Sequence, residues 1–256
     1  MLLTTIFVLS KFYSFCVKWL AYILKAKGRQ FVSHSCHNNH KLIIINIMQR
    51  QIPLLRGTFH QAMFFIAVGA CPLLIIKSSN ASEYVATAIY SVAVMMMFGF
   101  SALYHKFNWN KLTKKIMRKL DHIGIFIMIA GTATPFALLI TPWPDGLILL
   151  ILIWFVALLG ALQIIYLPNI NTFFNVAVYV GMSIVILPYL LKMFNIFTPA
   201  NSILMILGIF LYIIGAVGFG LKYPKLAPRI FGYHEVWHSF VAVAAILHFI
   251  VIYSII

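Results

Sequence analysis

The chain has 256 residues, of which 63% are apolar and only 9% are charged, and its mean hydropathy is +0.99. A soluble domain carries about a quarter charged residues, so this composition excludes a soluble protein and predicts an integral membrane protein. The three cysteines (Cys16, Cys36 and Cys71) show no paired spacing, which indicates neither disulfides nor a cysteine metal site.

The segment 1–47 differs from the rest of the chain. Residues 2–24 are apolar but are interrupted by two lysines, and residues 25–41 are polar. No small-residue cleavage site stands where a secretory signal would need one. The segment could form an interfacial helix, a further span, or an extension ahead of a true start at Met48. We expect the membrane domain to occupy residues 48–256.

From residue 59 onward, the chain contains apolar runs long enough to cross a bilayer, which takes about 17–25 residues each. The expected spans are residues 59–76, 83–104, 122–140, 146–166, 173–191, 200–220 and 234–255. Because the connections are short, the predicted fold class is an all-α membrane protein with a single seven-transmembrane helical bundle.

The net charge of +15 is distributed unevenly between the loops. Six basic residues lie between the second and third spans, three lie between the sixth and seventh, and Arg50 and Arg56 lie in the short stretch from Met48 to the first span. The other loops contain only Lys77 and Lys192. By the positive-inside rule, the bundle begins in the cytoplasm and the C-terminus lies outside. The charge is therefore explained by topology and contact with lipid headgroups, and we expect no nucleic-acid partner.

Histidines and acidic residues gather at the ends of three expected spans. His105 follows the second span, Asp121 and His122 begin the third, and His234 and His238 begin the seventh. Residues four apart share one helix face, so His234 and His238 can bind one metal ion together. The predicted topology places all of these residues near the cytoplasmic face. Polar residues at the ends of membrane helices are costly, which indicates a functional site.

Three motifs, in this order, resemble the hemolysin III family of bacterial membrane proteins. They are Ser101-x-x-x-His105, then Leu120-Asp121-His122 with Thr134-Pro135-Phe136, then Phe231-Gly232-Tyr233-His234-Glu235-x-Trp237-His238. That family is related to the progestin and adipoQ receptors and, more distantly, to alkaline ceramidases. The resemblance covers roughly residues 56–256.

The resemblance implies a seven-helix bundle in the bacterial inner membrane with a zinc ion near its cytoplasmic face. Carried over to this chain, the zinc ligands are His105, His234 and His238. Asp121 then positions a zinc-bound water, and Ser101 lies beside it. Many relatives begin the first span with Glu-x-x-Asn-x-x-x-His. Here only the histidine remains, as His60, which we expect to be a polar residue at the membrane interface and not a ligand.

The chemistry of these residue types agrees with that assignment. Three histidines with an open fourth position form a catalytic zinc site, whereas structural sites are closed by four protein ligands. Zinc lowers the pKa of a bound water to about 7, and Asp121 could serve as its general base. Ser101 lies one turn before His105 and could orient a substrate carbonyl. Taken singly, the histidines could also be helix-end residues in the headgroup layer, and Asp121 could be the N-cap of the third span.

His234-Glu235-x-x-His238 also matches the H-E-x-x-H signature of zinc proteases, in which the glutamate is the base. Such proteases need a third ligand, and the only histidine downstream is His248, deep in the seventh span. Glu235 is expected to point away from the histidine face, toward solvent or into a helix cap.

Three classes of function remain. We favour a zinc-dependent hydrolase acting on a lipid amide or ester, which the open site and the ceramidase resemblance support. A receptor or membrane-lipid regulator with a structural zinc is the second class, and a pore-forming cytolysin is the third. The expected spans are too apolar to line an aqueous channel, and a cytolysin should be released from the cell. The expected partners are membrane lipids, one of which could be the substrate.

Overall fold

The computed structural model describes residues 53–167, 172–227 and 230–256. The segment 1–47 therefore lies outside the described residues. Within those three ranges the chain is helical and has no β-strand, apart from one isolated bridge between Ala227 and Phe231. The prediction of an all-α fold is confirmed.

Seven helices follow one another through the described ranges. They are α3 (Thr58–Lys77), α4 (Ala81–Lys106), α5 (Lys111–Leu139), α6 (Asp145–Tyr166), α7 (Thr172–Met193), α8 (Pro199–Leu221) and α9 (Tyr233–Ile255). All except α5 match the expected spans to within two residues at each end. Six are long and apolar enough to cross a bilayer, and the described apolar part of α7 is Phe174–Leu190.

Helix α5 begins eleven residues before the expected third span, at Lys111 and not at residue 122. The side chain of Asn110 accepts a hydrogen bond from the backbone N–H of Thr113 at 2.8 Å and caps the helix there. Lysine and arginine are good helix formers, so the basic stretch continues the helix beyond its apolar part. The alternative that Asp121 is an N-cap is therefore wrong, and its carboxylate is free for another role.

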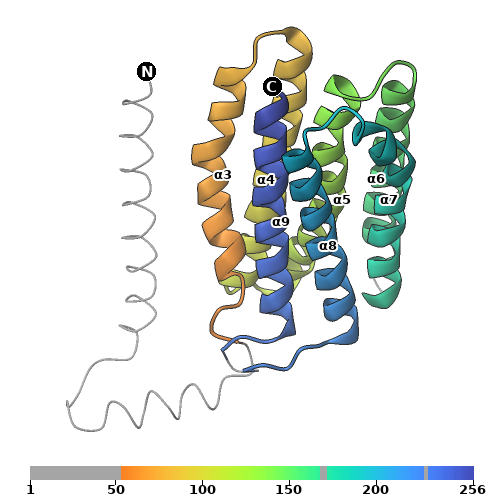
Figure 1. Ribbon diagram of the computed structural model, residues 1–256. Helices are drawn as coiled ribbons and strands as arrows, with labels where there is room; N and C mark the ends of the chain where they lie inside the picture. The colour runs from red at the N-terminus through yellow and green to blue at the C-terminus, as the bar shows by residue number, and fades with distance from the viewer. Residues whose placement is uncertain (1–52, 168–171, 228–229) are drawn as a thin grey trace, which may run out of the picture.

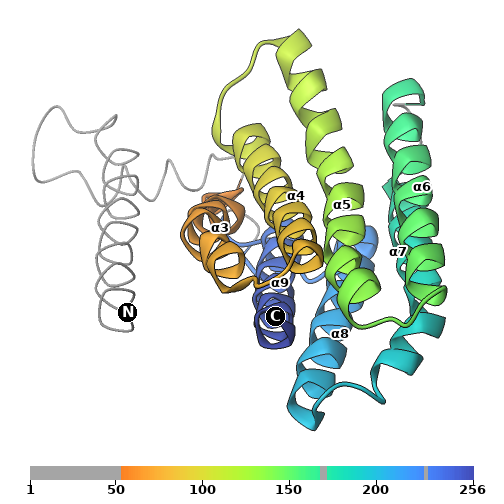
Figure 2. The same cartoon turned by 90° about the horizontal axis from the view of Figure 1, so that it is seen from above.

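The helices form a ring in which neighbours in sequence pack side by side, and α3 closes the ring against α9 (Figures 1 and 2). Helix α5 also contacts α7 and α9. This arrangement places the end of α4, the early turns of α5 and the start of α9 at the same end of the bundle.

The outer faces of the bundle expose many large apolar side chains. Ile151 and Phe155 on α6 are 60% and 56% exposed, and Ile203 and Phe210 on α8 are 58% and 56% exposed. Apolar surface on this scale is unfavourable in water but is covered by lipid chains in a bilayer. The outer faces of the helices therefore contact membrane lipids.

Candidate metal centre

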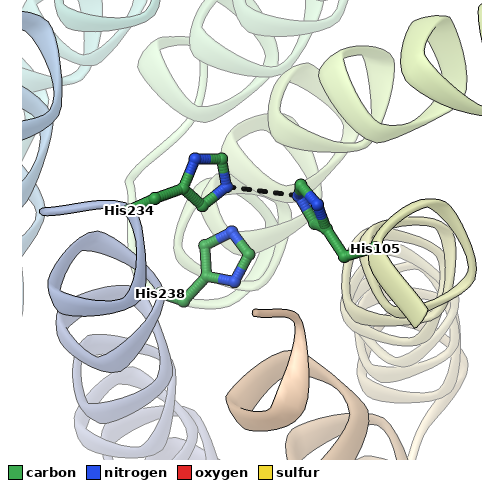
Figure 3. A group of neighbouring side chains, drawn as sticks. All are labelled: His105, His234 and His238. Atoms are coloured by element: carbon green, nitrogen blue, oxygen red, sulfur yellow. Dashed lines mark hydrogen bonds between the residues drawn. The ribbon is translucent and has the colours of Figure 1, made fainter. Parts of the chain in front are cut away.

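Three histidines from two helices converge at one end of the bundle. His105 lies in the last turn of α4, and His234 and His238 lie in the first two turns of α9. Figure 3 shows the three rings pointing toward one another. Nε2 of His105 lies 3.2 Å from Nε2 of His234, and the candidate ligand atoms of all three residues lie within 4.8 Å of one another.

The geometry of these rings fits a zinc ion. Two imidazoles that bind one tetrahedral zinc at about 2.0–2.1 Å have nitrogens roughly 3.3 Å apart. The His105 and His234 nitrogens already have this spacing, at 3.2 Å. His238 is 3% exposed, and its Nδ1 atom is buried without a hydrogen-bond partner. One pair of the three imidazoles therefore already has the spacing of zinc ligands, and the three together could hold a metal ion.

Asp121 is the carboxylate beside this histidine cluster. Its Oδ2 atom lies 3.7 Å from Nε2 of His105 and 4.0 Å from Nδ1 of His122. Nδ1 of His122 donates to the carbonyl of Arg118 at 2.7 Å, and His122 does not belong to the three-histidine cluster. Ser101 is buried one turn below His105, and its hydroxyl has no hydrogen-bond partner. The carboxylate thus lies near the point where a group bound to the cluster would sit.

His60 belongs to this centre, contrary to the expectation of an interfacial residue. It is 3% exposed, and its ring is stacked on His238 with the centroids 3.8 Å apart and the planes within 8°. Phe98 contacts His60 edge-on, and neither nitrogen of His60 has a hydrogen-bond partner. Parallel rings direct their nitrogens along parallel planes, so in this arrangement His60 supports His238 and does not converge on the same metal.

Gly57 allows α3 to approach the cluster closely. Its φ of +72° is in the left-handed region that favours glycine. A Cβ atom at this position would lie 2.6 Å from Cβ of His105. The turn that starts α3 is therefore packed directly against a candidate ligand.

Glu235 is fully buried and is not directed to solvent. One carboxylate oxygen accepts from the guanidinium of Arg56, and the other accepts from the backbone N–H of Gly232 at 2.8 Å. The N–H of Leu55 also donates to the carbonyl of Ile230 at 3.2 Å. The expected capping role of Glu235 is confirmed, and the alternative solvent role is wrong. These bonds tie the segment before α3 to the turn that carries His234.

We expect Glu235→Gln to lower the free energy of unfolding by about 2–3 kcal/mol. The glutamine can still cap Gly232, but it leaves the Arg56 guanidinium without its counter-charge. Breaking a fully buried pair costs roughly 3–5 kcal/mol, and the Arg56 side chain retains 23% exposure. Unfolding of the purified protein in detergent measures the loss.

The matched control is Asp145→Asn, which breaks the ion pair with Lys192 at the opposite end of the bundle. That pair is exposed, with the lysine side chain 57% accessible, so its loss should cost at most about 1 kcal/mol. Equal effects of the two substitutions would contradict a structural role for the buried pair.

Comparison with known proteins agrees with the motif resemblance. A family model described as "Haemolysin-III related" matches residues 48–249. "Hemolysin-3" of Bacillus cereus is 31% identical over 179 residues, which cover 69% of this chain and 78% of the relative. "Hemolysin-3 homolog" of Bacillus subtilis (strain 168) is 29% identical over 185 residues, which cover 71% and 84% of the two chains.

Proposed function

The chain belongs to the haemolysin-III-related family and is a multi-pass bacterial membrane protein, and from this we propose that it is a zinc-dependent hydrolase of a membrane-lipid amide or ester. One observation carries the proposal: the three-histidine cluster has the Asp121 carboxylate beside it. An apolar cavity lies between helices of the same bundle, and two of its lining residues, Ile125 and Trp237, are near Asp121 and His238 in the sequence. Such an arrangement suits a substrate with a polar scissile group and a hydrocarbon chain.

The cavity has a volume of about 230 Å³ and lies between α5, α7, α8 and α9. Its lining includes Trp237, which follows His234 by three residues on α9, and Ile125, one turn beyond Asp121 on α5. It continues past Val241 to His248, deep in α9. The walls are nearly all apolar, as in pockets that bind a ligand mainly by burying hydrocarbon.

The residues around the cluster would divide the work of hydrolysis between them. His105, His234 and His238 would hold the zinc, which when bound polarises a carbonyl and lowers the pKa of a bound water to about 7. Asp121 would take the proton from the attacking water and return it to the departing amine or alcohol. The Ser101 hydroxyl, which has no partner, could donate to the substrate carbonyl. The remaining apolar lining would exclude bulk water.

A protease function and a pore function have less support. In an H-E-x-x-H protease Glu235 would be the base, but both of its carboxylate oxygens already accept bonds from Arg56 and Gly232. A pore would need polar walls, whereas the cavity is lined by apolar side chains with only a few hydroxyls and His248. A receptor or lipid regulator with the same zinc site would bind a lipid without turning it over.

The proposed hydrolase is tested by offering the purified, zinc-loaded protein a panel of membrane lipids. Ceramides represent the amides and phospholipids represent the esters, and mass spectrometry detects released fatty acid. We expect release from at least one lipid class, and we expect chelation of the metal to abolish it. If no lipid on the panel is cleaved while zinc remains bound, the receptor or regulator function replaces this one.

We also propose that the histidine cluster faces the cytoplasm and that the C-terminus lies outside. The basic residues of the α4–α5 segment, such as Lys111, Lys114 and Lys115, lie at the same end of the chain's helices as the cluster, which supports this orientation. A reporter that works only on the outer side of the membrane should therefore be active when it is fused after Ile256. A single cysteine at position 114, in place of Lys114, should be labelled only from the cytoplasm. The opposite labelling pattern would place the site on the outer face.

A further inference from the structure

Two polar side chains, His248 and Tyr212, lie side by side in the cavity lining, away from the histidine cluster. His248 is 4% exposed, and its Nδ1 atom has no hydrogen-bond partner. The Tyr212 hydroxyl on α8 is also buried without a partner, and the two rings lie 5.5 Å apart. Both residues line the cavity. Buried polar atoms without partners are costly, so the pair indicates a ligand.

The surroundings of His248 fix which hydrogen bonds it can still make. Its Nε2 atom lies 3.4 Å from the carbonyl of Met205, a contact in which Nε2–H donates. Nδ1 is then an acceptor. Gly208 holds the ring in place, because a Cβ atom there would lie 2.4 Å from Nε2 of His248. The cavity wall thus presents an acceptor on His248 beside the Tyr212 hydroxyl, which can donate.

An acceptor next to a donor is complementary to a hydroxyl group, which donates one hydrogen bond and accepts others. His248 follows His238 by ten residues on the same helix, which is about 15 Å along its axis. The cavity lining is mostly apolar, as at Val241 and Met128, and its other hydroxyl groups are those of Thr132, Tyr179 and Ser183. A ligand that reaches both places needs a polar head, a hydrocarbon stretch and a hydroxyl farther along the chain.

We propose that Tyr212 and His248 bind a hydroxyl group in the hydrophobic chain of the lipid that occupies this cavity. The preferred ligands would be lipids with a hydroxylated acyl chain. The inference deepens the proposed function, since it uses the same cavity, but it concerns binding and does not depend on turnover.

The test compares the binding of octadecanoic acid and 12-hydroxyoctadecanoic acid to the full-length protein in detergent, by displacement of radiolabelled octadecanoic acid. One net hydrogen bond should make the hydroxylated acid bind about threefold to tenfold more tightly to the wild type. Tyr212→Phe changes only the hydroxyl and should remove most of this preference, and His248→Phe should do the same. Tyr166→Phe, an equivalent change at a residue that is 75% exposed, should leave the preference unchanged.

Equal binding of the two acids to the wild type, or an undiminished preference in Tyr212→Phe, would overturn the inference. His248→Phe could disturb packing, but the isosteric Tyr212→Phe variant keeps the result interpretable. A protein that prefers the hydroxylated acid yet cleaves no lipid would keep this inference and refute the proposed hydrolase. A protein that cleaves lipids without this preference would do the reverse.

Discussion

Replacing Asp121 with asparagine is expected to lower lipid hydrolysis by about 10²–10⁴-fold, the usual contribution of a general base. Asparagine has nearly the same size and can still form hydrogen bonds, but it cannot accept a proton at neutral pH. The carboxylate lies 3.7 Å from Nε2 of His105, so it is close enough to serve a bound water without being one of the clustered ligands. Metal content should therefore stay at the wild-type level while fatty-acid release falls.

The control for this variant is Asp145→Asn, which removes a carboxylate from the opposite end of the bundle and should leave turnover unchanged. Metal analysis of both proteins separates loss of the base from loss of the zinc. If Asp121→Asn released fatty acid at the wild-type rate, Asp121 would have no part in proton transfer. If it lost its zinc, the carboxylate would be a metal-binding or positioning group instead.

Alanine at His105, His234 or His238 is expected to weaken zinc binding by more than 100-fold. Loss of a residue that only supports a ligand costs roughly 10–100-fold, so loss of a ligand should cost more. The measurement is zinc per protein after dialysis against a buffer of fixed free zinc concentration. His248→Ala is the matched control, because it removes a buried histidine from the same helix outside the cluster. Full zinc retention in His105→Ala would contradict the proposed ligand set.

The sequence was sufficient to predict the helices because apolar run length is a local property. Helix α3, for example, begins at Thr58 and ends at Lys77, within one residue of each end of the apolar run. The start of α5 was missed for the same reason, since hydropathy marks where a helix enters the bilayer and not where Asn110 caps it. That α7 crosses the membrane as the seventh span is still a prediction, and so is the orientation of the bundle.

The contacts around the cluster depend on tertiary structure and were harder to predict. Arg56 and Glu235 pair across 179 residues, and nothing in the H-E-x-x-H signature shows that this glutamate is already engaged. His60 is the one residue that this chain keeps of the relatives' first-span motif, and that could have indicated a place in the site. Its stacking on His238 could not be predicted, because it depends on the packing of α3 against α9. The cavity depends on the packing of α5, α7, α8 and α9, which no local pattern contains.

Binding of a zinc ion by His105, His234 and His238 is tested most directly by X-ray absorption at the zinc edge on the purified, zinc-loaded protein. We expect three imidazole ligands at about 2.0–2.1 Å with one further oxygen, and no sulfur. In His238→Ala the imidazole signal should fall or the metal should be lost altogether. A spectrum with sulfur ligands, or one with fewer than three imidazoles in the wild type, would contradict the claim.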